Sequence, residues 1–133
     1  MKEKLIKLLD NSYSPYSKFR VASIVIMKDG REFNGVNVEN ASYGAAICAE
    51  RSAIVSAITA GYKKGDFKEL YVMCDSPKIS SSCFICRQVI SEFFNLDDKV
   101  TFMSNLGEQK TYLVKEICPV PFNEEDLIWN QGL

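Results

Sequence analysis

Residues 20–38, RVASIVIMKDGREFNGVNV, decide the fold more than any other stretch of the chain. The run VASIVIM is apolar and rich in β-branched residues, which favour buried strands. KDG at 28–30 has the composition of a tight turn, and REFNGVNV at 31–38 follows as a second extended arm. The pattern predicts a β-hairpin over residues 20–38 with a buried first strand.

The segments on either side of the hairpin alternate between helical and extended patterns. LIKLL at 5–9 has the apolar spacing of an amphipathic helix, and YSPYSKF at 13–19 is predicted to be a loop. The tail CPVPFNEEDLIW at 118–129 is broken by prolines and is predicted to hold one last helical turn. Between the hairpin and the tail we expect helices over 48–60 and 83–94, and strands over 69–75, 99–104 and 111–117.

This order of elements predicts a single α/β domain over residues 1–133. Strands interleaved with helices favour one sheet that is covered by helices. Crossover connections through the two later helices would make the sheet mixed. We therefore expect a three-layer α/β/α sandwich around a five-stranded mixed sheet.

Composition and charge exclude several classes of protein. The 133 residues carry a formal net charge of −1, and the lysines and arginines are scattered, so the basic stripe of a nucleic-acid-binding protein is missing. No apolar run approaches the ~20 residues that cross a bilayer, and the N-terminal segment lacks the continuous core of a signal peptide. We expect a cytoplasmic protein with reduced thiols, a small ligand, and neither a nucleic-acid nor a membrane partner.

The chain contains no histidine, yet ICAERSAI at 47–54 and SSCFICRQ at 81–88 place cysteines close to charged residues. Cys48 stands two residues before Glu50, and Cys83-x-x-Cys86 opens a later predicted helix. Cys-x-x-Cys is a spacing of zinc ligands and also of redox pairs. At a helix start, backbone N–H groups and the helix dipole favour the thiolate, which is the form that binds metal. Two helix starts directed at one point would deliver three thiolates.

Three protein ligands and one open position are the arrangement of a catalytic zinc site. Zinc of this kind lowers the pKa of a bound water toward about 7, and Glu50 would stand beside that water as the proton carrier. Three thiolates exceed the charge of the metal by one, so we expect Arg51 to hydrogen-bond the sulfurs from outside the ligand set. Sulfur would then replace histidine as the ligand.

On these residues the sequence resembles the small, homotetrameric, three-cysteine cytidine deaminases. Zinc deaminases combine a His or Cys ligand, a catalytic glutamate two residues later and a following Cys-x-x-Cys. The resemblance extends over nearly the whole chain, with the family's order and spacing of motifs. The matching motifs are YSPYSKF, NVENASYG, CAERSAI, DSP, CxxCRQV with EF, and PVPFNEEDL.

The resemblance implies an enzyme of pyrimidine salvage that converts cytidine and deoxycytidine to uridine and deoxyuridine and releases ammonia. It implies one zinc ion per subunit, bound by Cys48, Cys83 and Cys86. Glu50 would pass protons from the attacking water to ring N3 and to the leaving amine.

The resemblance also implies substrate contacts. Asn37 and Glu39 would hold the ribose 3′-hydroxyl, and Phe19 would line the pyrimidine pocket. Phe122 would reach the pocket of a neighbouring subunit, because the family's active sites lie at subunit interfaces. A homotetramer with shared active sites is thus implied by the resemblance alone.

The segment around Cys83 and Cys86 departs from the family's Pro-Cys-Gly-Ala-Cys sequence. Ser82 replaces the proline, Phe84 the glycine and Ile85 the alanine, and Ala22 replaces a glycine of the first strand. Proline restricts the chain before the ligand, and small residues leave room near the metal. We expect the bulky side chains to narrow the pocket or to shift the helix start, which leaves the rate and substrate range open.

Other readings of these residues stay open on the sequence alone. One alternative is an enzyme of the same family that acts on another aminopyrimidine, such as a nucleoside antibiotic of the blasticidin type. Phe84 and Ile85 favour this alternative, whereas the retained NVEN motif argues against it. A structural zinc domain or a nucleoside-binding module would not need Glu50. Editing of polynucleotides is the least favoured function. As alternatives to substrate contacts, Phe19 and Phe122 would be core aromatics, and Asn37 and Glu39 polar groups at a strand end.

Overall fold

The hairpin over residues 20–38 forms the start of the sheet in the structure, a computed structural model in which residues 1–128 are described. Strands β1 (Val21–Met27) and β2 (Glu32–Val36) pair antiparallel, with Ala22 opposite Val36. The turn between them closes through a 2.8 Å hydrogen bond from the Met27 N–H to the Arg31 carbonyl. Gly30 takes a φ of 92° in this turn, a conformation that glycine adopts without steric cost.

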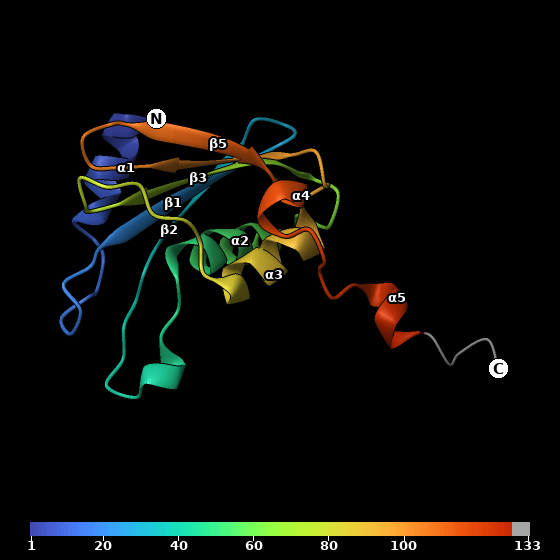
Figure 1. The fold of residues 1–133 in the computed structure, drawn as a ribbon, viewed down its shortest axis with the longest axis horizontal. Coiled ribbons are helices and arrows are strands. Elements are labelled where there is room, and N and C mark those ends of the chain that lie inside the picture. The colour runs from blue at the N-terminus through green and yellow to red at the C-terminus, as the bar shows by residue number, and fades with distance from the viewer. Residues whose placement is uncertain (129–133) are drawn as a thin grey trace.

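Five strands form one mixed sheet in the order β2-β1-β3-β4-β5 (Figure 1). The other three strands are β3 (Phe67–Cys74), β4 (Lys99–Met103) and β5 (Gln109–Leu113). Only the β3–β4 pair is parallel among these neighbours, and a parallel pair requires a crossover connection. Helix α3 (Phe84–Phe93) provides that crossover, so the predicted mixed sheet is confirmed.

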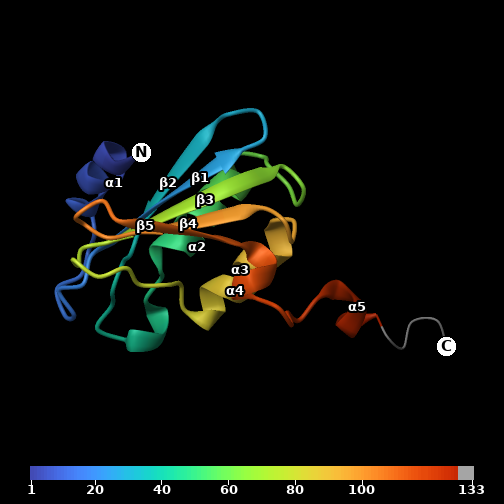
Figure 2. The ribbon, with the colours of Figure 1, turned by 45° about the horizontal axis from the view of Figure 1, so that its top comes forward.

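Helices cover both faces of the sheet and produce the three layers predicted from the sequence (Figure 2). Successive residues of β1 point to opposite faces, as the pleat of a strand requires. Ile24 packs with α1 (Lys2–Leu9), whereas Val25 packs with α2 (Ala49–Thr59) and α3. The α2 and α3 boundaries agree with the predicted ranges to within a residue. Within residues 1–128, no helix has the length and apolarity that a membrane span requires.

The strand predicted over 111–117 is wrong in its second half. β5 ends at Leu113, and residues 114–117 form the short helix α4 (Val114–Ile117). The Glu116 side chain accepts a 2.8 Å hydrogen bond from the Leu113 N–H and caps the turn. Val114 and Ile117 are both buried, and a three-residue spacing puts them on one side of a helix but not of a strand.

The tail contains the predicted last helical turn, α5 (Glu124–Leu127), which begins at the Asn123 cap. A short 3₁₀ turn, η1 (Tyr43–Ala45), lies in the connection between β2 and α2. Residues 129–133 of the predicted domain 1–133 lie outside the described residues.

Helix α2 lies directly against β2 because Gly35 leaves no side chain between them. A Cβ atom at Gly35 would lie 2.4 Å from the Ala49 carbonyl oxygen and 2.4 Å from the Ala53 nitrogen. Both of these atoms belong to the α2 backbone, which cannot move aside as a flexible side chain would. The close approach therefore fixes the start of α2, the end that carries Cys48 and Glu50.

Gly35→Ala is expected to lower the free energy of unfolding by about 1–3 kcal/mol, the usual cost of overpacking, or by more if α2 must shift. Gly44→Ala is the matched control, because a Cβ atom there meets nothing within 4 Å. Equilibrium denaturation of both variants measures the difference. Equal unfolding midpoints for the two variants would contradict the close approach of α2 to β2.

Candidate active site

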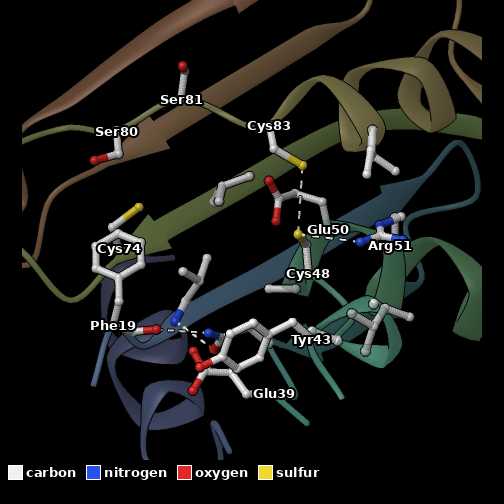
Figure 3. Close-up of a pocket in the computed structure, with 18 residues that line it drawn as sticks. Phe19, Glu39, Tyr43, Cys48, Glu50, Arg51, Cys74, Ser80, Ser81 and Cys83 are labelled. Carbon is white, nitrogen blue, oxygen red and sulfur yellow. Dashed lines mark hydrogen bonds between the residues drawn. The ribbon is translucent and has the colours of Figure 1, made fainter. Parts of the chain in front are cut away.

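The starts of α2 and α3 bring three cysteines together, Cys48, Cys83 and Cys86. Figure 3 shows two of them, Cys48 and Cys83. Cys48 and Cys83 are the residues that precede the two helices, and both have extended backbone, with φ of −77° and −66°. Cys86 lies in the first turn of α3, where its N–H donates a 3.5 Å hydrogen bond to the Cys83 sulfur. The sequence therefore predicted correctly that two helix starts meet.

The three sulfur atoms have the spacing of ligands on one metal ion. They all lie within 4.8 Å of one another, and the Cys48 and Cys83 sulfurs are 3.8 Å apart. Two sulfurs on a tetrahedral zinc, each with a bond of about 2.3 Å, are separated by about 3.8 Å. A disulfide would need about 2.05 Å, and all three cysteines are free. The donor set therefore fits zinc.

Hydrogen bonds favour the thiolate at Cys48. Contact with the Cys86 thiol, helped by Arg51, lowers the pKa of Cys48 to about 5. The same contact with Cys48, together with burial, raises the pKa of Cys86. A metal ion that binds all three sulfurs must displace the proton that this pair holds. The Arg51 Nη2 atom donates to the Cys48 sulfur at 3.6 Å, which is the contact predicted for Arg51.

Glu50 lies beside the sulfurs of Cys48 and Cys83 in the interior of the site (Figure 3). Its side chain is buried, with 4% of the residue exposed. Burial raises the pKa of the Glu50 carboxyl, and a hydrogen bond from Ser82 opposes this effect. The Ser82 hydroxyl donates to Glu50 Oε2 at 2.6 Å. A buried carboxyl group beside a metal-binding cluster is suited to proton transfer.

A cavity of about 460 Å³ joins the sulfur cluster to residues near the hairpin. Its volume lies within the range of about 300–1,000 Å³ that holds small molecules. Glu50 and the cluster cysteines Cys48 and Cys83 line one part of the wall, and three of the four predicted substrate contacts line another (Figure 3). These contacts are Phe19, Asn37 and Glu39.

Asn37 and Glu39 hold the preceding loop against the cavity. Glu39 accepts hydrogen bonds from the backbone N–H groups of Tyr16 and Ser17, at 3.0 and 3.1 Å, and from the Ser17 hydroxyl. The Asn37 side-chain amide donates to the Phe19 carbonyl at 2.8 Å. Both side chains therefore have hydrogen-bond partners at the strand end and also line the cavity. Their contact with a ribose stays a prediction.

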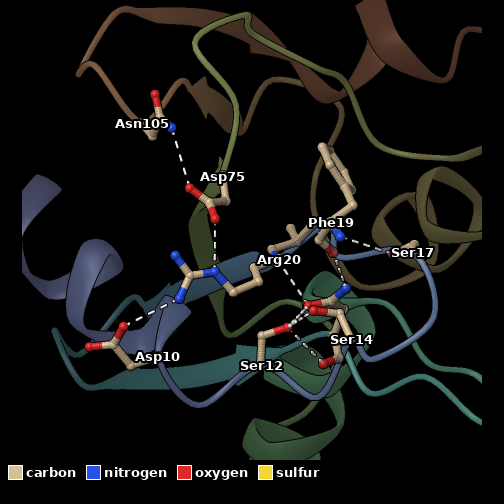
Figure 4. A network of polar contacts seen from close by, with 10 residues as sticks. Asp10, Ser12, Ser14, Ser17, Phe19, Arg20, Asp75 and Asn105 are labelled. Carbon is tan, nitrogen blue, oxygen red and sulfur yellow. Dashed lines mark hydrogen bonds and ion pairs between the residues drawn. The ribbon is translucent and has the colours of Figure 1, made fainter.

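An ion-pair network anchors the other side of this loop (Figure 4). Arg20 donates to Asp75 at 2.8 Å and to Asp10 at 3.3 Å. Asn105 completes the network with a 3.3 Å hydrogen bond to Asp75, whose pKa is lowered chiefly by Arg20. The network connects the loop to the end of β3 and so keeps Phe19 at the edge of the cavity.

Phe122 lies outside the cavity. Its backbone is held by the Gln88 side chain through hydrogen bonds of 2.6 and 3.1 Å, and 55% of the residue is exposed. Phe19 is also partly exposed, at 40%, so neither aromatic residue is part of the core. The role of Phe122 in a neighbouring subunit stays a prediction.

The two bulky replacements near the metal ligands behave differently. Ile85 lines the cavity, as expected for a residue that narrows it. Phe84 is 75% exposed and packs under the Arg87 guanidinium at 4.4 Å, so the expectation that it narrows the pocket is wrong. α3 begins one residue after Cys83, so neither side chain shifts the helix start by more than one residue.

Sequence analysis missed several residues that line the cavity. Tyr43 stands inside the NVENASYG motif, and Ser80 and Ser81 stand three and two residues before Cys83, so proximity to a motif along the chain was the available signal. The contact of Ser82 with Glu50 was also missed, because only the loss of proline was considered there. The residues missed in the cavity wall include Tyr43, Cys74, Ser80 and Ser81.

Three convergent thiols beside a buried carboxyl group, on an α/β/α sandwich, define a zinc-dependent hydrolytic deaminase site. The family model for the cytidine and deoxycytidylate deaminase zinc-binding region matches residues 1–104. The chain belongs to the cytidine deaminase family. Zinc is the cofactor, and the three-sulfur cluster accommodates one ion per subunit.

Similar proteins agree with this membership. The chain is 37% identical to a cytidine deaminase of Halalkalibacterium halodurans and 38% identical to one of Sporosarcina psychrophila. Each alignment covers 94% of this chain and 93% of the relative. The crystal structure of cytidine deaminase from Burkholderia pseudomallei superposes with a TM-score of 0.86 at 35% identity, over 90% of this chain and 94% of that one.

Cys83→Ala is expected to lower zinc affinity by more than about 100-fold, since even changes to the partners of metal ligands cost about 10- to 100-fold. Cys118→Ala is the control, because Cys118 is a free, buried cysteine outside the three-sulfur cluster. Competition with a chromophoric chelator measures both affinities. Equal affinities for the two variants would show that Cys83 is not a ligand.

Proposed function

We propose that the protein deaminates the nucleosides cytidine and deoxycytidine to uridine and deoxyuridine, with release of ammonia, in pyrimidine salvage. The observation that carries this proposal is the buried Glu50 carboxyl group beside three convergent sulfurs in a nucleoside-sized cavity. Relatives that match over most of the chain are cytidine deaminases, which supports the choice of base.

The proposed zinc ligands are Cys48, Cys83 and Cys86, whose sulfur spacing supports a single ion. Zinc held there supplies Lewis-acid activation of a water molecule near neutral pH. Arg51 donates to the Cys48 sulfur and offsets part of the negative charge that three thiolates bring.

Glu50 is the proposed acid/base residue. Its carboxylate takes a proton from the attacking water and delivers it to ring N3, which makes C4 more electrophilic. The remaining hydroxide adds to C4. Glu50 then takes the proton of the hydroxyl group now on C4 and gives it to the exocyclic amine, so that the C4–N bond breaks, ammonia leaves and the C4 carbonyl of uridine forms. Burial raises the pKa of Glu50 and brings it closer to neutral pH, which improves its ability both to accept and to donate the proton.

Phe19, Asn37 and Glu39 are the proposed contacts to the nucleoside, with Phe19 at the base and the other two at the ribose. A carboxylate offers about four acceptor positions. Glu39 uses three of them for the loop, so one remains for a ribose hydroxyl group. The Asn37 amide donates one hydrogen to Phe19 and keeps its second N–H.

We also propose a homotetramer in which Phe122 completes the pocket of a neighbouring subunit. Exposed apolar side chains near the cavity and in the tail support an interface there, because large exposed apolar groups mark contact surfaces. They include Tyr43, Phe84, Val120 and Phe122. We propose one domain over residues 1–133. The free thiols support a cytoplasmic location, where cysteines stay reduced.

Glu50→Gln is expected to lower the turnover of cytidine by at least about 10²–10⁴-fold, because the amide cannot carry the proton. The variant should keep its zinc, since no ligand is lost. Glu92→Gln is the matched control, because Glu92 lies in α3 and is not among the residues that line the cavity. Turnover is followed by the loss of cytidine absorbance and by ammonia release.

Two results of this experiment would contradict the proposed function. The first is a wild-type protein that contains zinc and leaves cytidine unchanged. The second is a Glu50→Gln variant with wild-type turnover, which is the result expected of a structural zinc domain. The remaining alternative is an enzyme that prefers another aminopyrimidine, and it stays open because Ile85 lines the cavity. Competition between cytidine and a blasticidin-type nucleoside distinguishes it from a cytidine deaminase.

Deoxycytidine is expected to have a higher kcat/KM than its 5′-monophosphate, by about 100-fold or more. Among the described residues that line the cavity, Arg51 is the only basic one, and it already contacts a cysteine sulfur. A phosphate would also lie near the Glu39 carboxylate, and like charges brought together cost several kcal/mol. Steady-state kinetics with both substrates measures the ratio. Equal values would reject a nucleoside-level enzyme.

A further inference from the structure

Ser82 makes a buried polar contact that the reaction described above does not use. Its hydroxyl donates to Glu50 Oε2 at 2.6 Å, and both residues are only 4% exposed. Ser82 belongs to the loop before α3, whereas Glu50 belongs to the first turn of α2. The contact thus joins the two helix starts that carry the sulfurs.

We propose that Ser82 is a positioning residue for catalysis: its hydroxyl holds Oε2 of Glu50 and leaves Oε1 as the oxygen that carries the proton. This inference rests on the proposed deaminase function and assigns a role to a residue that does not touch the substrate. Ser82 is absent from the cavity wall, so it acts through Glu50 alone.

The burial of Glu50 makes this contact important. Burying a carboxyl group without hydrogen bonds costs free energy. The glutamate side chain also has three rotatable bonds, so the carboxyl group needs a contact that fixes its orientation. Within residues 1–128, Ser82 is the only side chain that donates a hydrogen bond to the Glu50 carboxyl group. Loss of the hydroxyl would therefore leave Oε2 without a side-chain donor and free the carboxyl group to rotate.

Ser82 is itself held in place by Arg87, one turn into α3. The Arg87 Nε atom donates to the Ser82 carbonyl at 2.8 Å. The remaining guanidinium nitrogens donate to the Ile117 carbonyl at 3.0 Å and to the Ser81 hydroxyl at 2.8 Å. These bonds restrict the loop as a proline would, while serine adds a hydroxyl group that proline lacks. A fixed donor is what a positioning role requires.

The hydrogen bond can persist through the whole proton cycle. A serine hydroxyl rotates freely about its C–O bond and donates one hydrogen. It donates to Oε2 when Glu50 is ionised, and it can still do so when the proton sits on Oε1. The orientation of the carboxyl group is then the same when it accepts and when it delivers the proton, which lowers the cost of reaching the transition state.

Ser82→Ala tests the proposal, with Ser82→Thr as the variant that restores a hydroxyl. Loss of one hydrogen bond to a charged group is expected to lower kcat about tenfold or more. KM for cytidine should stay within about twofold, because Ser82 does not line the cavity, and zinc affinity should not change. Ser82→Thr should recover most of kcat.

A spectroscopic readout tests the same contact independently of turnover. In protein labelled with ¹³C at the glutamate carboxyl carbons, the Glu50 signal is identified by its loss in Glu50→Gln. That signal should shift in Ser82→Ala and return toward its original position in Ser82→Thr, with or without zinc. Ser23→Ala is the control: Ser23 is also buried and donates to the Tyr71 carbonyl at 2.9 Å, so the variant should lose stability but not kcat.

The outcomes separate this inference from the proposed function. An unchanged kcat and an unmoved Glu50 signal in Ser82→Ala would overturn the positioning role. A fall in kcat that comes with zinc loss, or with an equal fall in Ser23→Ala, would reduce Ser82 to a structural residue and would overturn it too. Inactivity of the zinc-loaded wild-type protein would instead reject the deaminase function, and the ¹³C signal would still decide whether Ser82 holds Glu50.

Discussion

The convergence of two helix starts on one point is the constraint on which the site depends. α2 is fixed because Gly35 lets its backbone lie directly on β2, and α3 is fixed because it connects the parallel strands β3 and β4. Neither helix alone carries a complete site, since α2 supplies Cys48 and Glu50 while α3 supplies the Cys-x-x-Cys pair. The sulfur spacing that fits zinc is therefore a property of the sheet as well as of the ligand motif.

Charge explains how the site functions without histidine. Thiolates bring more negative charge than imidazoles do, and a carboxylate beside them adds to it. Arg51 contacts the Cys48 sulfur, and a divalent metal bound there would neutralise most of the remainder. Burial raises the pKa of Glu50, which suits it to the proposed proton transfer. The Ser82 hydroxyl adds a neutral donor, which orients Glu50 without adding another charge.

Strong local patterns explain which features the sequence predicted. The apolar run of β1 and the small apolar residues of α2 define their elements within a residue or two, and the ligand spacing identified all three sulfurs. The four residues of α4 were wrongly expected in a strand, because so short a segment fits both the 3.6-residue period of a helix and the two-residue period of a strand. The Glu116 side chain that caps the helix is recognised only in the structure. Similarly, the sequence could not show which of the adjacent residues Phe84 and Ile85 lines the cavity, because that depends on how α3 is oriented. Ser82 carries no motif, so its contact with Glu50 depends on tertiary placement alone.

X-ray absorption at the zinc K-edge of the purified protein tests directly whether the three convergent cysteines bind the metal, because it reports the atoms around the metal. Three sulfur neighbours at about 2.3 Å and one lighter atom at about 2.0 Å are expected, the coordination of an open catalytic site. Four sulfur neighbours would indicate a closed structural site, and a shell of nitrogen and oxygen atoms alone would mean that the metal is not bound by the convergent cysteines. Either result would contradict the account.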